Sequence, residues 1–171
     1  MRGSHRIPLL SNRFARPASL RYDVAMNRGL RRIALLGSEA PQNVLGLVAF
    51  AQFAPRGKLA RVRFERERLL VEITSAGAVS LGLFVFLTPR DNAYVPVGAE
   101  NEAHEYGHSI QSRWLRPLYL PVVGIPSELR VIYAFAHKHL RGRRWGGYYD
   151  GFPENWADTL GGVDKALRPR P

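Results

Sequence analysis

The chain contains no cysteine among its 171 residues. Disulfide bonds and thiolate ligands for a metal ion are therefore excluded, and histidine and carboxylate remain as the strong ligands for zinc. The absence of cysteine is compatible with a reducing compartment. We expect a cytoplasmic protein, with association with a membrane as the alternative.

Long apolar runs are also absent. Residues 44–54 form the first apolar stretch, and its eleven residues are fewer than the roughly 20 that a helix needs to cross a bilayer. The stretch suits a buried helix or strand. No apolar core of a signal peptide follows the N-terminal arginines, because Ile7-Pro8-Leu9-Leu10 is too short.

Acidic residues are scarce, with 14 Asp and Glu against 25 Lys and Arg, and the net charge is +11. Residues 1–38 carry +7 of this charge, since they contain eight arginines and a single acid, Asp23. We favour a basic, weakly ordered extension for residues 1–38. A transit peptide and a natural start at Met26 are the alternatives. Because no nucleic-acid-binding motif accompanies the charge, nucleic acid is not an expected partner.

One short motif, His104-Glu105-Tyr106-Gly107-His108, points to metal chemistry. Histidines four residues apart lie on one face of a helix and can bind the same zinc ion. Glu105 follows the first histidine, where a carboxylate can take a proton from a water molecule at the metal. The alternative is a surface helix whose histidines are solvated.

The flanks of the motif predict a helix. Acidic residues precede it, arginines follow it, and Pro117 ends it. Gly107 in such a helix costs about 1 kcal/mol relative to alanine. Close packing of another helix or strand against Gly107 would explain that cost.

A third protein ligand is expected from a second, downstream helix. Residues 152–162 predict this helix, with Pro153 at its first position and a pair of glycines at its end. Glu154 and Asp158 lie four residues apart on one face. Glu154 can bind the metal, and Asp158 can accept a hydrogen bond from a ligand histidine. The alternative is that Glu154 only complements the positive end of the helix and Asp158 is solvated.

The HExxH motif followed by ExxxD, with alanine before the aspartate, resembles the gluzincin metallopeptidases related to the CAAX-prenyl-protease and heat-shock membrane-protease families. The resemblance implies that His104, His108 and Glu154 bind zinc, that Glu105 is the general base and that Asp158 orients a ligand histidine. A closer resemblance covers HEYGHSIQSRWLRPLYLPVVGIPS and YYDGFPENWADTLGGV. These strings are similar to small uncharacterised bacterial proteins with HEYGH-x-x-QS and WADxLGGV.

The segment before the motif predicts a small antiparallel sheet. Residues 59–65 alternate apolar and charged side chains, residues 69–73 follow as the hairpin partner, and residues 79–87 predict a third, more buried strand. By analogy with small gluzincin domains, residues 83–87 are the candidate edge strand to which an extended substrate adds. An ordinary core strand is the alternative.

The segment after the motif is apolar and interrupted by prolines. Residues 118–126 predict either a loop packed on the active helix or a surface that dips into a membrane. Ser127 is expected to cap a helix over residues 128–140. His137 and His139 are two residues apart, which makes them a poor ligand pair, and we expect them at the surface.

Together these features predict an α+β, zincin-like domain over residues 40–167. The predicted reaction is zinc-dependent hydrolysis of a peptide bond in a peptide or protein substrate, with Glu105 as general base. Tyr148 and Tyr149 are candidate oxyanion stabilisers, with core packing as the alternative. The alternative function is a catalytically silent zinc-binding domain for interaction with a membrane or a protein.

Overall fold

The structure is a computed structural model, and it describes residues 30, 33, 34, 36–75, 77–88, 94, 95 and 97–168. The predicted extension, residues 1–38, lies largely outside the described residues. The described part has an α+β architecture with a four-stranded sheet. Its elements in chain order are α2 (Ala40–Phe53), η1 (Ala54–Arg56), β1 (Leu59–Glu65), β2 (Arg68–Ile73), β3 (Val79–Leu81), β4 (Phe84–Leu87), α3 (Asn101–Leu115), η2 (Arg116–Leu118), η3 (Leu120–Gly124), α4 (Ile125–Arg141), α5 (Glu154–Gly161) and η4 (Lys165–Leu167).

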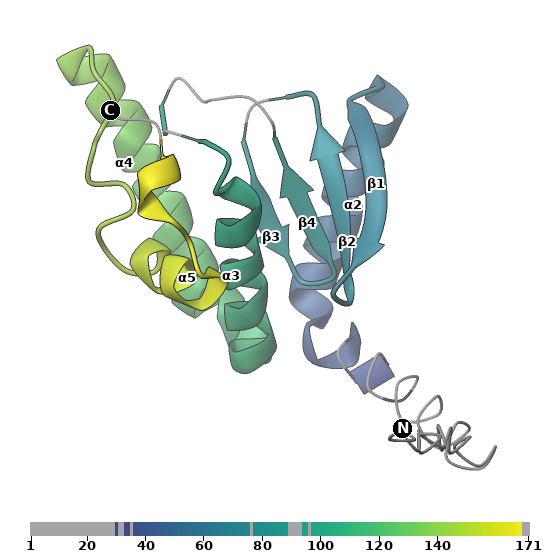
Figure 1. Ribbon diagram of the computed structural model, residues 1–171. Helices are drawn as coiled ribbons and strands as arrows, with labels where there is room; N and C mark the ends of the chain where they lie inside the picture. Colours follow the sequence, from purple (N-terminus) through teal and green to yellow (C-terminus); the bar gives the residue numbers. More distant parts are fainter. Residues whose placement is uncertain are drawn as a thin grey trace, which may run out of the picture.

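The sheet is mixed and has the strand order β1-β2-β4-β3 (Figure 1). β1 and β2 form the expected antiparallel hairpin, and β3 pairs antiparallel with β4, but β2 and β4 are parallel. The prediction of a purely antiparallel sheet is therefore wrong. Its cause is the run 79–87, which is not one strand: Gly82, at φ +60°, turns the chain between β3 and β4. Only a residue tolerant of positive φ fits there without strain.

The position of β4 corrects a second expectation. Residues 84–87 pair on both sides, with β2 and β3, so they cannot accept an additional strand. The alternative interpretation, a core strand, is the correct one. β3 is the edge strand of this half of the sheet, and it lies next to α3 (Figure 1).

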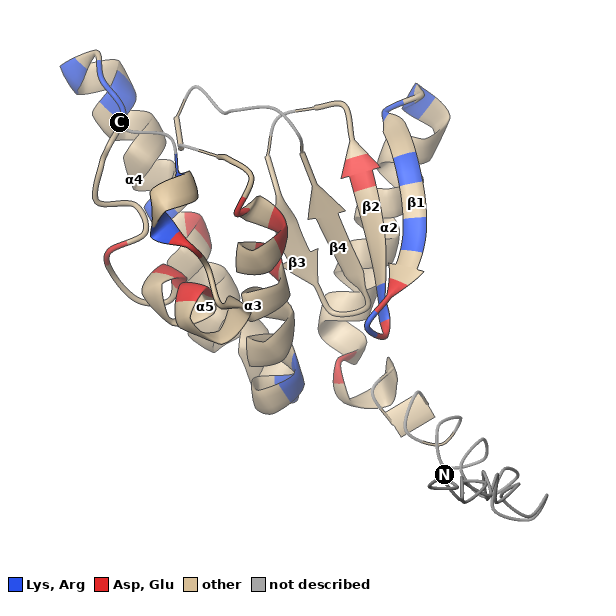
Figure 2. Ribbon diagram, in the orientation of Figure 1, with Lys and Arg blue, Asp and Glu red and all other residues tan. Residues whose placement is uncertain are grey.

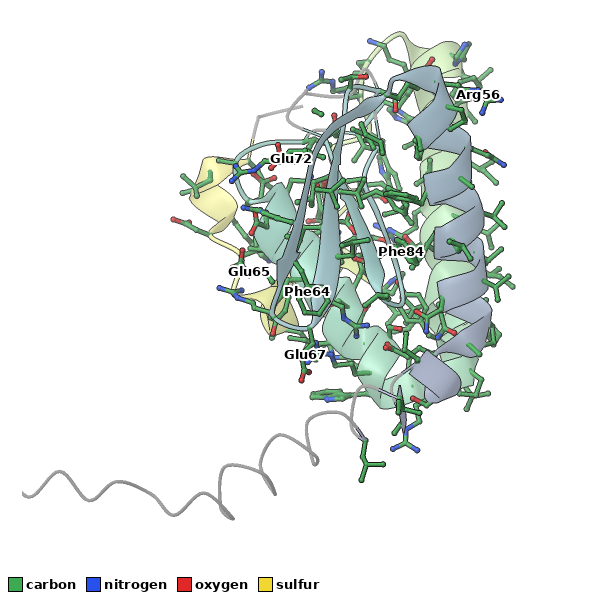
Figure 3. The ribbon with its side chains drawn as sticks, turned by 90° about the vertical axis from the view of Figure 1, so that its right-hand side faces the viewer. Arg56, Phe64, Glu65, Glu67, Glu72 and Phe84 are labelled. Atoms are coloured by element: carbon green, nitrogen blue, oxygen red, sulfur yellow. The ribbon has the colours of Figure 1, made fainter. Side chains whose placement is uncertain are left out.

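The apolar core lies between α2 and one face of the sheet. Phe84 and Phe86 of β4 contact Phe50 and Phe53 of α2, with ring centroids 5.9 and 5.6 Å apart. Figure 3 shows Phe84 between the sheet and α2. The intervening residue of β4, Val85, belongs to a separate buried cluster, as the alternation of side chains along a strand requires. Of the two interpretations of residues 44–54, the helix is correct, but it is not buried as expected, because Val44, Leu45, Leu47 and Val48 are exposed.

Helices α3 and α5 approach each other through glycines. A Cβ atom on Gly107 would lie 1.9 Å from the carbonyl oxygen of Ala157, and one on Gly161 would lie 2.0 Å from that of Ala103. This contact confirms the close packing expected from Gly107. It also fixes the two predicted ligand helices against each other, with α3 between the sheet and α5 (Figure 1).

Residues 118–126 are helical, whereas a loop packed on the active helix was one of the two expectations for them. η2 and η3 continue into α4, which begins at Ile125, three residues before the predicted start. Prolines fall at the first or second positions of all three elements, and Pro117 follows the break at Arg116 (φ +53°), where a missing N–H costs little. Ser127 is therefore inside α4 and not its cap, and Pro153 is the N-cap of α5 and not its first residue. Within the described residues, no helix is both long and apolar enough to cross a bilayer.

Candidate metal centre

The three predicted ligands meet between α3 and α5. His104 and His108 project from successive turns of α3, and Glu154 is the first residue of α5. The Oε2 atom of Glu154 lies 3.0 Å from Nε2 of His104 and 3.2 Å from Nε2 of His108. The two Nε2 atoms are 3.2 Å apart. All three side chains are buried, and within the described residues they are the only group of its kind that could hold a metal ion.

Hydrogen bonds to the opposite ring nitrogens orient both imidazoles. Nδ1 of His104 lies 2.7 Å from Oδ1 of Asp158, and Nδ1 of His108 lies 2.7 Å from Oε1 of Gln111. The Gln111 amide is oriented in turn, because its nitrogen donates to a main-chain carbonyl 3.2 Å away. Both partners are acceptors, so each Nδ1 carries a hydrogen. The Nε2 lone pairs therefore face the Glu154 carboxylate.

The spacing of these three atoms fits a small divalent ion. Bonds of 2.0–2.1 Å in tetrahedral geometry place neighbouring ligand atoms about 3.3 Å apart. The three separations here are 3.0, 3.2 and 3.2 Å. Three protein ligands leave a fourth position for water or substrate. The buried group can thus bind a metal ion, as predicted from the sequence.

The charge at the centre supports the same conclusion. Burial disfavours the charged form of His104, yet its hydrogen bonds with Asp158 and Glu154 outweigh burial and raise its pKa to about 9. Burial also opposes ionisation of Glu154, but the two histidines hold its pKa far below the usual range. Both shifts favour a positive charge among these acceptors. The centre requires a positive charge, whether a proton or a metal ion.

Glu105 lies beside the ligand group but is not part of it. Its side chain is buried, and burial, opposed by the neighbouring histidines, raises its pKa. The hydroxyl of Ser80, on β3, lies 3.0 Å from Oε2 of Glu105 and 2.6 Å from its main-chain oxygen. Ser80 therefore connects the sheet edge to the carboxylate that we predicted to be the base.

The structure adds outer contacts that the sequence did not predict. Ser127 donates a hydrogen bond to Oε1 of Glu154 at 2.6 Å, which leaves Oε2 for the metal. Arg168 donates to Oδ1 of Asp158, and its guanidinium lies 3.4 Å from the centre of the Tyr149 ring. Gln111 could have been found from its i+3 spacing to a ligand histidine. Ser80, Ser127 and Arg168 come from distant segments, and no local pattern marks them.

The two candidate oxyanion stabilisers occupy different positions. Tyr149 contacts His104 edge-on, with ring centroids 5.1 Å apart, whereas Tyr148 packs against Tyr149 and Ala134. Burial raises the pKa of both hydroxyls well above the usual value, so both remain protonated donors. Both tyrosines belong to one core cluster, the Tyr148 hydroxyl hydrogen-bonds with Ser127 beside Glu154, and Tyr149 contacts the ring of His104.

His137 and His139 lie apart from the metal centre. His139 is exposed and His137 is partly buried, and their Nδ1 atoms each lie 3.1 Å from a main-chain carbonyl oxygen of the same helical region. The expectation that they are not ligands agrees with this placement.

Comparison with protein-family models, with curated proteins and with solved structures gave no match.

Proposed function

We propose that this protein is a zincin-like, gluzincin-type peptidase that hydrolyses peptide bonds with zinc held by His104, His108 and Glu154. One observation carries the proposal: two imidazoles and a carboxylate converge on one point, and a second buried carboxylate, Glu105, follows the first ligand on the same helix. A structural site needs no such additional carboxylate.

Zinc is the metal that this donor set favours. Two imidazole nitrogens and one carboxylate oxygen are a common ligand set of catalytic zinc with one open position. Magnesium and calcium prefer sites made of oxygen, and no thiolate is present to favour softer metals. Both histidines are oriented by acceptors on Nδ1, as ligand histidines of zinc sites usually are.

The protein's own residues would divide the chemistry between them. When bound, zinc supplies Lewis acidity that lowers the pKa of water from 15.7 toward roughly 7 and polarises a carbonyl group. Glu105 accepts the proton of the attacking water and passes it to the leaving nitrogen. The raised pKa of Glu105 suits it to hold that proton between the two transfers. Tyr149, which contacts His104, is the better of the two candidate donors to the oxyanion.

The substrate in this proposal is an extended peptide. β3 is the edge strand next to α3, and Ser80 in its centre contacts Glu105. A peptide that adds to β3 as another strand passes close to the base, and it replaces the Tyr119 hydroxyl that donates to the main-chain oxygen of Ser80 at 3.2 Å. This role moves from residues 83–87, where the sequence suggested it, to residues 79–81.

The buried position of the ligands favours a second candidate function, a zinc-binding domain without catalysis. A pair of variants separates the two. Metal content and cleavage of a mixed peptide library are measured for the wild type, for Glu105→Gln and for Glu128→Gln, an exposed control on α4. The peptidase requires zinc in all three and loss of cleavage, on the order of 10²–10⁴-fold, only in Glu105→Gln. If the wild type binds zinc but cleaves no peptide, the protein is a zinc-binding domain without catalysis. If the wild type binds no zinc, both candidate functions are wrong.

A further inference from the structure

Helix α4 has an apolar outer face that is largely exposed in the described structure. Ile125, Leu129 and Ile132 are 58%, 59% and 55% exposed, and Leu140 near the end of the helix is 82% exposed. Their spacing of four, three and eight residues puts them on one side of the helix. The opposite side buries Ala134 against the tyrosines near the metal centre. Most amphipathic helices expose a polar outer face, and α4 does not.

Helix α2 repeats this pattern. Its inner side packs on the sheet, while Val44 and Leu47 are 60% and 58% exposed, and Leu45 and Val48 are about half exposed. None of the residues in Ala40–Phe53 carries a charge. The outer side of α2 is thus uncharged over its whole length and mostly apolar, with Gln52 as an exposed polar residue near its end.

The two outer faces belong to one side of the molecule. In Figure 1, α2 lies behind the sheet and α4 lies behind α5, and in Figure 3 both helices are on the right-hand side. A hydrogen bond from Gln42 of α2 to the main-chain oxygen of Arg116 connects α2 to the segment that leads into α4. We call the outer surface of these two helices the α2–α4 face.

The charged residues around this face are mostly basic. Figure 2 shows α2 without charge and places Lys and Arg beyond its C-terminal end and at the C-terminal end of α4. Among the exposed side chains of the two helices, Glu128 is the only acid. The exposed basic residues at the borders are Arg56, Lys58, Arg116, Arg141 and Arg143.

We propose that the α2–α4 face docks the protein onto an anionic lipid bilayer. An apolar surface with a basic border combines the two attractions that bind a protein to such a bilayer, burial of apolar side chains and contact with acidic headgroups. A second copy of the chain fits less well, because a symmetric pair would bring two basic borders together. The α5 side of the metal centre would then face water.

The test uses the full chain and flotation with vesicles of phosphatidylcholine, alone or mixed three to one with phosphatidylglycerol. Leu129→Glu and Ile132→Glu each place a charge on the face, and each should weaken binding to the mixed vesicles about tenfold or more. Leu167→Glu is the matched control. It makes the same change of charge at a residue that is 54% exposed on η4, away from the face, and should change binding less than about twofold.

The salt dependence of vesicle binding distinguishes docking through the α2–α4 face from general attraction between basic residues and acidic headgroups. Raising NaCl from about 0.1 M to about 0.5 M shortens the screening length, so binding by charge alone should disappear. Binding through the face should persist in part and should still respond to Leu129→Glu. Equal binding of Leu129→Glu and Leu167→Glu would overturn the proposal. A second result would also overturn it: the wild type sediments as a dimer, and Leu129→Glu dissociates this dimer but leaves vesicle binding unchanged. The α2–α4 face would then join two copies of the chain. Thermal melting of each variant verifies that it is folded.

Discussion

Helix α3 contacts two buried polar clusters, and they differ in how their charges are balanced. Near the C-terminal half of α3, Arg68 forms a two-pronged ion pair with Glu39, at 2.7 and 3.0 Å. The same guanidinium donates to the main-chain oxygens of Gly82 and Ser109, at 2.7 and 2.9 Å. Near the N-terminal half, the metal centre brings together two imidazole lone pairs and one carboxylate.

The difference shows why only one of these clusters is a candidate metal site. In the ion pair, a cation and an anion of the chain neutralise each other, and the terminal guanidinium nitrogens find acceptors. In the metal centre, acceptors outnumber donors, and only an added proton or metal ion completes the set. Buried polarity alone therefore does not indicate function. An unmatched set of converging acceptors indicates a possible metal site.

Loss of the ion pair should have the largest effect on stability and none on metal binding. Glu39→Ala leaves the Arg68 charge buried without a counterion, which should cost about 3–5 kcal/mol in the free energy of unfolding. Glu67→Ala is the control: its pair with Arg113 is partly exposed, at 3.6 Å, and should contribute less than about 1 kcal/mol.

Denaturant unfolding and zinc content of the folded fraction measure both effects. If Glu39→Ala lost zinc while still folded, the two clusters would be coupled, and the comparison between them would not hold.

Removal of the metal should have the next largest effect on stability. A ligand at a hundredfold excess over its Kd stabilises the folded state by about 2.7 kcal/mol, so a chelator should lower the melting temperature of the zinc-loaded protein by several degrees. His108→Ala should melt at the same temperature with and without chelator. Glu39→Ala should keep the response. A chelator effect that persists in His108→Ala would place the metal elsewhere.

The sequence predicted the group that could bind a metal ion, because that group depends on helical periodicity. His104 and His108 are four residues apart, as are Glu154 and Asp158, and such spacing fixes a shared face before any tertiary contact is known. Gly107 predicted the close approach of a second element, and α5 provides it.

The sequence could not predict contacts made between distant segments. Parallel pairing of β2 with β4 depends on the path of the chain between them, and a single residue, Gly82, divides the apolar run 79–87 into two strands. Ser80 and Ser127 are ordinary polar residues in sequence, and they act at the centre only because the fold brings their segments to it.

Asp158 should affect zinc affinity more than stability. Loss of a side chain that orients a metal ligand typically costs 10–100-fold in affinity, and we expect this loss for Asp158→Ala. Asp158→Asn keeps an oxygen that can accept from Nδ1 of His104, so its loss should be smaller. Asp164→Ala, an exposed acid that caps η4, is the control and should bind zinc as the wild type does. Chelator competition gives the affinities. Equal values for the wild type and both Asp158 variants would remove Asp158 from the centre.

Two neighbours on α3 offer the finest test of the comparison. Gln111 contacts the metal centre through His108, and Ser112 contacts the ion pair through Glu39, although both are fully buried and adjacent. Gln111→Met leaves Nδ1 of His108 without its acceptor, so zinc affinity should fall about tenfold. Ser112→Ala removes one hydrogen bond to a carboxylate and should cost about 1.5–3 kcal/mol of stability without a change in zinc affinity. The same chelator competition and denaturant unfolding measure both variants. If Ser112→Ala also weakened zinc binding, the buried polar residues of α3 would form one connected network. The metal centre and the ion pair would then have to be treated as a single site.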